Sequence, residues 1–223
     1  MSQARKFLFA AAFLLLHCTL YPHEISIRLK EKLEIRVQSE NLVIESLKCS
    51  DIPAMQELRA KEENMSLFAN RNPVSKEKTL LRCINWIKRW ESGNPFSAMS
   101  IFTREGEFIG YAVMGYGDDP DTGEENAPGL SEFAIIIDSD YWGLGYGTEA
   151  AGVMLFKLAP ELKDKKFSLS GAPLQRVIFT TSPDNPGMVR LCEKLGIGIQ
   201  RTFGPNEPGN PWNFEKYFYE LEI

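Results

Sequence analysis

The chain has 223 residues, of which 43% are hydrophobic and 25% are charged, which is an ordinary globular composition for one domain-sized core. Its net charge of −5 leaves no excess of positive charge for a nucleic-acid backbone, so nucleic acid is not expected as a partner. Both histidines, His17 and His23, lie near the N-terminus. A catalytic triad or zinc site that needs an imidazole in the folded body is therefore excluded, and any general base must be a carboxylate, an amine, a water or a tyrosinate.

The four cysteines are widely spaced and form no C-x-x-C pair: Cys18, Cys49, Cys83 and Cys192. This spacing predicts neither a zinc knuckle nor a redox dithiol, and no metal is expected. We interpret the cysteines as free thiols, with long-range disulfides left open as the alternative.

The N-terminal residues 1–23 resemble a leader. Arg5 and Lys6 precede ten apolar residues, 7–16, and this is the charged region and short apolar region of an export signal. Ten apolar residues are too few for a helix that spans a bilayer, which needs about 20. The segment is either a signal, a membrane-associating stub whose contact would involve residues 5–21, or a stretch outside the mature fold.

The next part of the chain predicts a linker, a strand and two helices. Residues 24–41 are mixed and charged and are interpreted as a linker, and Leu42–Leu47 alternates weakly as a strand. Ser50 or Asp51 can cap a first helix. Ser75 is the expected cap of a second helix, which Gly93 ends.

Three strands are predicted next, over Ala98–Thr103, Glu107–Gly115 and Ser131–Asp138. The short turn 104–106 makes the first two strands antiparallel neighbours. The acidic stretch 118–125 contains turn residues without a core pattern, and its spacing is not that of a calcium-binding EF-hand, so it is interpreted as a solvated loop.

The C-terminal part predicts a helix over Thr148–Leu162, a strand over Arg176–Thr181 and a further helix that Asn185 caps. Residues 198–223 are expected to form two strands around a loop rich in proline and glycine. The resulting order is β-α-α-β-β-β-α-β-α-β-β, which indicates an α/β protein with a mixed sheet and helices on its faces.

Three glycines at alternate positions, Gly143, Gly145 and Gly147, lie between a predicted strand and a long predicted helix. Glycines allow a tight turn whose amides point into one concavity, and the following helix N-terminus favours an anion such as a pyrophosphate. The spacing fits neither the P-loop nor the dinucleotide-binding fingerprint, so ATP and NAD are disfavoured. A glycine-rich turn without any ligand is the alternative.

The segment Trp142–Gly147 resembles the acyl-CoA-binding loop of the GNAT N-acetyltransferases, whose consensus is Arg/Gln-x-x-Gly-x-Gly/Ala. Its continuation to Ala150 is similar to the version in the ribosomal-protein alanine acetyltransferase branch. A second segment, Asn185–Gly196, is similar to the family's N-x-x-S-x-x-x-x-E-K-x-G-F motif. The resemblance covers residues 42–223, which we interpret as a single GNAT-like domain.

The resemblance implies a mostly antiparallel sheet with helices on both faces, in which the strand 131–138 splays from the strand 176–181. Acetyl-CoA would bind in that gap as the co-substrate, with its pantetheine paired to the strand edge. The residues implied for its binding are Ile136, Ile137, Trp142, Gly143, Leu144, Gly145, Tyr146, Gly147, Thr148 and Asn185. Trp142 replaces the usual arginine or glutamine, so the phosphate site would depend on main-chain donors.

The resemblance also implies a catalytic base. Glu132 lies on the strand before the glycine loop and is the candidate, with an exposed strand carboxylate as the alternative interpretation. No acid is assigned for the departing thiolate, because Cys192 stands where many relatives have a tyrosine and Met188 stands in place of serine. Cys192 is expected to pack in the core.

The expected function is therefore transfer of an acetyl group from acetyl-CoA to a primary amine of a small molecule or a protein N-terminus. A non-catalytic acyl-CoA-binding or protein-interaction module on the same fold is the alternative. The need for acetyl-CoA favours a cytoplasmic location, whereas the leader suggests export or membrane association.

Overall fold

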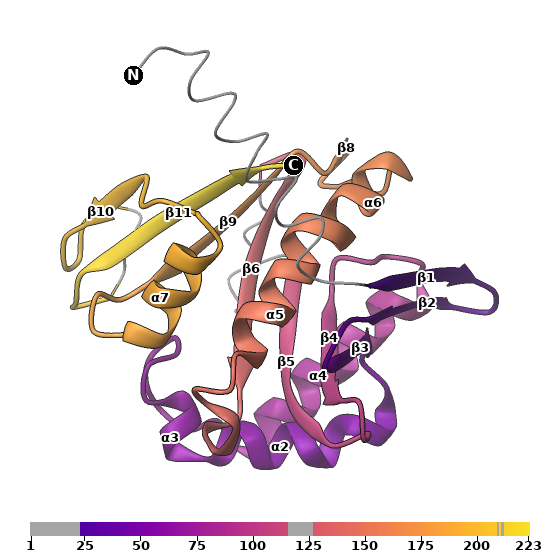
Figure 1. Cartoon of the computed structure of the whole chain (residues 1–223), viewed down its shortest axis with the longest axis horizontal. Coiled ribbons are helices and arrows are strands. Elements are labelled where there is room, and N and C mark those ends of the chain that lie inside the picture. The colour runs from indigo at the N-terminus through magenta and orange to yellow at the C-terminus, as the bar shows by residue number, and fades with distance from the viewer. Residues whose placement is uncertain (1–22, 116–126, 209, 211) are drawn as a thin grey trace.

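The computed structural model describes residues 23–115, 127–208, 210 and 212–223 (Figure 1). The expected leader, apart from residue 23, and the acidic stretch 118–125 lie outside the described residues.

A mixed sheet forms the centre of the described structure, and β6 and β9 are its one parallel pair of neighbours there (Figure 1). A separate small hairpin follows the long helix and consists of β7 (Ser168–Leu169) and β8 (Ala172–Pro173). In spatial order the nine strands of the sheet are β1 (Glu24–Leu29), β2 (Leu33–Gln38), β3 (Leu42–Ser46), β4 (Ala98–Thr103), β5 (Phe108–Gly115), β6 (Leu130–Ile137), β9 (Arg176–Thr181), β11 (Lys216–Glu222) and β10 (Arg201–Phe203).

Helices cover both faces of this sheet, as the figure shows, and this arrangement confirms the predicted fold class (Figure 1). On one side of the core lie η1 (Cys49–Asp51), α2 (Ile52–Ala60), α3 (Glu62–Met65) and α4 (Lys76–Glu91). The others are the single turn η3 (Ser139–Tyr141), the run of α5 (Tyr146–Val153), η4 (Met154–Leu158) and α6 (Ala159–Asp164), and α7 (Pro186–Lys194).

Two groups of buried side chains fix these helices to the sheet. The larger group joins α5, α6 and α7 to strands from β2 to β11, and includes Ala150, Leu158, Leu191 and Tyr219. The smaller group joins α2 and α4 to the other face of β5 and β6. β6 is therefore held between two helical layers, whereas β9 packs against the larger group alone.

The long helix predicted over Thr148–Leu162 is present, but it contains the π turn η4. The Ala159 amide bonds to the Met154 carbonyl five residues earlier. Pro160 has no amide hydrogen and its ring would crowd an α-helical turn, so a local widening of the helix accommodates it.

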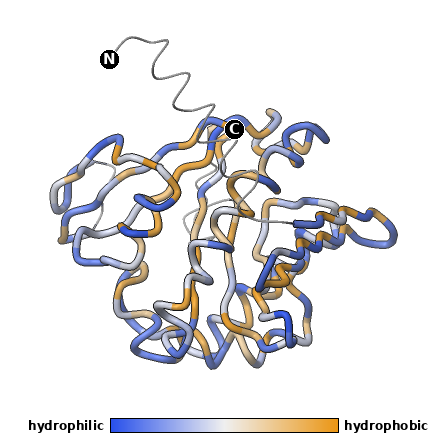
Figure 2. The backbone as a smooth tube through the Cα atoms, in the orientation of Figure 1, coloured by the Kyte–Doolittle hydropathy of each residue, from blue (hydrophilic) through white to orange (hydrophobic). Residues whose placement is uncertain are grey.

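Residues 24–41 were interpreted as a linker, and this is wrong for most of them, because they contain β1 and β2. Leu33, Ile35 and Val37 are buried, whereas Glu34 and Arg36 between them face solvent. The tube through this hairpin alternates between hydrophobic and hydrophilic colour (Figure 2). The charged residues of the exposed face hid a strand pattern of period two.

Two local predictions are confirmed. β4 and β5 are antiparallel neighbours, and Gly106 in their turn adopts a φ of 92°. Ser75 caps α4, since its side chain accepts a hydrogen bond from the Lys78 amide.

Candidate active site

The parallel pair β6 and β9 separates partway along its length. The paired residues are Leu130 with Arg176, Ser131 with Val177, and Glu132 with Ile178. Beyond Glu132, β6 continues to Ile137 and β9 to Thr181 without further pairing between them. The strand splay that the resemblance implied is therefore confirmed.

The main chain of β6 decides which residues face this gap. The Asp138 amide donates to the Ile109 carbonyl of β5, and the Ile136 carbonyl lies against Gly110 of β5. Because peptide groups alternate between the two sides of a strand, those of Ile135 and Ile137 face the gap instead. The sequence prediction included Ile136 and missed Ile135, since the alternation can be assigned only once the register with β5 is known.

At the end of the gap, the Trp142 indole Nε1 donates a hydrogen bond of 2.7 Å to the Ile137 carbonyl oxygen. The indole nitrogen is thus used to fold the loop back onto β6 and is not available to a phosphate. The Trp142 side chain nevertheless remains half exposed beside the gap.

The glycine loop runs from η3 to α5. Gly143 and Gly145 have φ values of 80° and 90°, which lie in the region that favours glycine. A Cβ built on either residue meets no atom within 4 Å, so their lack of a side chain leaves open space at the loop surface. Leu144 between them is 63% exposed. The loop therefore presents main chain, rather than side chain, to its surroundings.

Gly145 is also the N-cap residue of α5 and supplies no side-chain oxygen to cap the helix. The first hydrogen bond of the helix runs from the Glu149 amide to the Gly145 carbonyl oxygen, over 3.0 Å. The amides of Tyr146, Gly147 and Thr148 precede it and have no acceptor within the helix. Three donors and the positive end of the helix dipole thus suit a pyrophosphate at this corner.

The turn that begins this loop is fixed by the corner between α2 and α3. The Lys61 ammonium bonds to the carboxylates of Asp138 at 2.7 Å and Asp140 at 2.8 Å, and Asn64 accepts a hydrogen bond from the Ser139 amide at 2.7 Å. Burial acts to raise the pKa of the Asp138 carboxyl, but the hydrogen bond from Lys61 and the Asp140 amide outweigh it and lower that pKa. The carboxylate is thus held ionised where β6 ends.

A second anchor holds α5 itself. The Glu149 carboxylate is buried and accepts hydrogen bonds from the Ser39 hydroxyl at 2.7 Å, the Asn41 amide at 2.8 Å and the Asn41 side chain at 2.9 Å. These partners lie between β2 and β3, more than 100 residues earlier in the chain. Sequence reasoning missed this contact, because no local pattern relates the two segments.

Glu132 is the last residue of β6 that pairs with β9, and it lies where these two strands part. Its half-buried side chain is on the opposite face of β6 from Phe133, which packs in the larger core group. Burial lowers the pKa of the Lys216 ammonium on β11, and the Glu132 carboxylate is near enough to oppose part of this effect. Lys216 was not among the residues predicted from the sequence.

The second family segment forms α7 as predicted. Asn185 caps the helix, because its side-chain oxygen accepts a hydrogen bond of 3.1 Å from the Met188 amide. Cys192 is 1% exposed and belongs to the larger core group together with Tyr219. Burial raises the pKa of the Cys192 thiol to about 12, so this residue packs in the core as expected.

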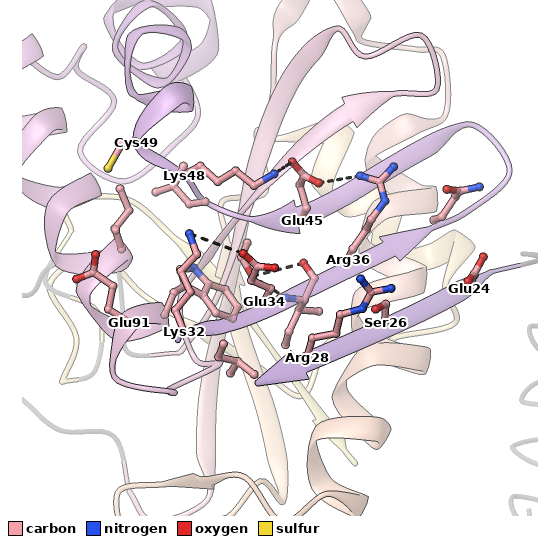
Figure 3. Close-up of a pocket in the computed structure, with 17 residues that line it drawn as sticks. Glu24, Ser26, Arg28, Lys32, Glu34, Arg36, Glu45, Lys48, Cys49 and Glu91 are labelled. Atoms are coloured by element: carbon pink, nitrogen blue, oxygen red, sulfur yellow. Dashed lines mark hydrogen bonds and ion pairs between the residues drawn. The ribbon is translucent and has the colours of Figure 1, made fainter. Parts of the chain in front are cut away.

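A cavity of about 350 Å³ lies at the other end of the sheet, over β1, β2 and β3 (Figure 3). Several of its charged side chains form pairs: Arg36 bonds to Glu45 at 2.7 Å, Lys48 bonds to the same carboxylate, and Lys32 lies 3.8 Å from Glu34. Since these charges neutralise one another, the cavity offers little to a charged ligand.

Within the described residues there is no cluster of three or more histidine, cysteine or acidic side chains that could hold a metal ion. None of the helices in that part of the chain has the length and apolar character needed to cross a membrane.

Solved structures share this fold. An acetyltransferase (GNAT family) from Bacillus anthracis is 20% identical, with a TM-score of 0.60 over 84% of this chain and 98% of that chain. An acetyltransferase from Salmonella typhimurium, which modifies the N-terminal serine of a 50S ribosomal subunit protein, is 14% identical, with a TM-score of 0.62 over 83% of this chain and 96% of that chain. A phosphinothricin acetyltransferase from Sinorhizobium meliloti in complex with AcCoA is 16% identical, with a TM-score of 0.59 over 82% of this chain and 89% of that chain.

A search of curated proteins found no match to the chain. A family model described as an acetyltransferase (GNAT) domain matches residues 41–197, which is more than half of the chain and includes the glycine loop, the strand gap and α7. The chain therefore belongs to the GNAT acetyltransferase family, whose chemistry is acyl transfer from acetyl-CoA.

Proposed function

We propose that this protein transfers the acetyl group of acetyl-CoA to a primary amine, either a small molecule or a protein N-terminus, in the cytoplasm. The observation that carries the proposal is the parting of β6 and β9 at Glu132, directly beside the open N-terminus of α5. Two structural neighbours, which act on a ribosomal-protein N-terminus and on phosphinothricin, support an amine acceptor.

The main chain would hold the co-substrate at two places. The amides of Tyr146, Gly147 and Thr148 would bind the pyrophosphate, and the amide and carbonyl of Ile135 together with the Ile137 amide would pair with the pantetheine amides as an added strand does. The residues present fit this ligand, because the loop surface at Gly143 and Gly145 is open. The acetyl group would then lie near the point where the strands part.

Glu132 would act as the general base. An amine is mostly protonated at neutral pH, so a nearby carboxylate must accept a proton before the nitrogen attacks the thioester carbonyl. Glu132 meets the positional requirement, because it projects from the vertex of the strand gap. Cys192 is not assigned as the acid that protonates the departing thiolate, because its side chain is enclosed in the core.

Binding is tested by isothermal titration with coenzyme A. We expect the wild type to bind and Gly145→Glu to lose more than about 100-fold in affinity, because a carboxylate would enter the phosphate position. Gly171→Glu is the matched control: Gly171 has a φ of 84°, and a Cβ there also meets no atom within 4 Å, but it lies in the β7–β8 turn. Equal affinity of both variants would contradict the phosphate site.

Chemistry is tested by coenzyme A release with a panel of amines. We expect Glu132→Gln to lower turnover by about 10²- to 10⁴-fold, the range for a lost general base, with the coenzyme A dissociation constant nearly unchanged. A variant as fast as the wild type would remove Glu132 from the mechanism. Binding without turnover of any amine would favour the non-catalytic module.

A further inference from the structure

Lys216 is a buried lysine that has no polar partner among the described residues. The residue is only 8% exposed, and its ammonium forms no hydrogen bond or ion pair with another described residue. The rings of Phe214 and Trp212 lie 5.0 and 5.9 Å from Nζ and favour a cation, but they provide no hydrogen-bond acceptor for its three donors.

Lys216 lies on the same face of the sheet as Glu132. Tyr217 and Tyr219 of β11 pack against the larger core group beside α7, so Lys216, which alternates with them, is on the other face (Figure 1). Phe133 likewise places Glu132 on that face. The carboxylate and the ammonium therefore lie on one face of the sheet, beside the parted strands.

Among the described charges near Lys216, Arg71 has a carboxylate partner and Lys216 has none. Arg71 makes two hydrogen bonds to Asp184, at 2.8 and 2.9 Å, and its guanidinium lies 4.0 Å from the centroid of Phe214. Burial lowers the pKa of the Lys216 ammonium and Arg71 lowers it further, whereas Glu132 and Asp184 oppose this. No carboxylate of the described residues accepts a hydrogen bond from the Lys216 ammonium.

We propose that Lys216 binds a carboxylate of the acceptor, so that the acceptor is an amine that also carries an acidic group. This inference rests on the proposed function. The site would direct the amine of the acceptor to Glu132 and its carboxylate to Lys216. A single unpaired positive charge matches a single carboxylate, and such a partner would offset the cost of burying the ammonium. The carboxylate belongs either to a free amino acid or to an acidic side chain near a peptide N-terminus.

Matched pairs of acceptors test this specificity and distinguish the two sources. Alanine against alaninamide tests the α-carboxylate, and the peptide amide Asp-Ala-Ala against Asn-Ala-Ala tests a side-chain carboxylate. We expect the wild type to favour the acidic member of one pair by roughly 10- to 100-fold in kcat/KM, as measured by coenzyme A release, which is the range for a hydrogen bond to a charged group.

Variants separate binding of the carboxylate from a structural role. Lys216→Met should slow the acidic member of the pair far more than the amide member and so remove the preference, whereas Lys216→Arg should keep part of it. Lys216→Met should also raise the melting temperature, because an apolar side chain replaces a buried charge without a polar partner. Lys88→Met, an exposed lysine on α4, is the control and should change neither quantity.

Equal rates for both members of each pair in the wild type would overturn the proposal, and so would an equal slowing of both by Lys216→Met. If acetyl-CoA neither binds nor turns over, the proposed function fails separately. The site is then judged by thermal melting with whichever acidic probe is used, alanine or the aspartyl peptide. Stabilisation of the wild type but not of Lys216→Met would support it, and absence of stabilisation by either probe would overturn it.

Discussion

The buried Glu149 carboxylate allows a quantitative test of how the helix with the phosphate-binding terminus is held. Glu149→Ala removes three hydrogen bonds to a charged group, leaves the two Asn41 donors without their acceptor, and leaves the Ser39 hydroxyl only the Leu42 carbonyl at 3.4 Å. At about 1.5 kcal/mol for each such bond, the free energy of unfolding should fall by about 4–5 kcal/mol. This corresponds to a melting temperature lower by roughly 8–20 °C for a chain of this size.

Differential scanning calorimetry measures this change, with two further variants for comparison. Glu149→Gln retains one acceptor oxygen and should lose only about 1–2 kcal/mol. Glu161→Ala removes an exposed carboxylate from α6 in the same helical run and should shift the melting temperature by no more than about 2 °C. A melting temperature for Glu149→Ala within 2 °C of the wild type, an outcome of about the same size as this control, would refute the reasoning.

Burial acts to raise the pKa of Asp138, but the hydrogen bond from Lys61 opposes it and the folded pKa is lowered. The ionised carboxylate therefore stabilises the fold above its unfolded pKa of about 3.9. This stabilisation is lost as the pH falls through the lower folded pKa. Lys61→Met should therefore flatten the decrease in melting temperature between about pH 5 and pH 3, and an unaltered profile would argue against the contact. Among the described cysteines, exposed Cys49 should react first with an alkylating reagent, while Cys83 and Cys192 stay unmodified in the native protein, because burial raises their pKa values to about 11 and about 12. Peptide mass spectrometry measures the order, and early modification of Cys192 would contradict its place in the core.

Local chemistry made parts of this fold predictable from the sequence. The Asn185-Pro186 start of α7 and the Ser75 start of α4 appear in the structure as expected, since a cap depends on residues within one turn. The glycine loop was found because Gly143 and Gly145 need a positive φ that other residues rarely adopt. The gap between β6 and β9 followed from the family resemblance and not from periodicity.

The features that were missed depend on contacts between distant segments. Ile135 rather than Ile136 faces the gap because of the register with β5, and that register cannot be read from β6 alone. The bond between Asn41 and Glu149 joins residues 108 positions apart. Lys216 became notable only when the structure placed it beside aromatic rings and on the face of Glu132.

The β1–β2 hairpin extends the folding unit beyond the boundary that family membership suggests. The family match begins at residue 41, but Leu33, Ile35 and Val37 are at most 1% exposed, and Ser39 helps to hold Glu149. A fragment that started at the match would present β3 as a bare sheet edge and expose the apolar surface beneath the lost hairpin. Such an edge invites pairing between molecules, so insolubility of that fragment would reflect where it was cut and not an inability of the family's fold to form.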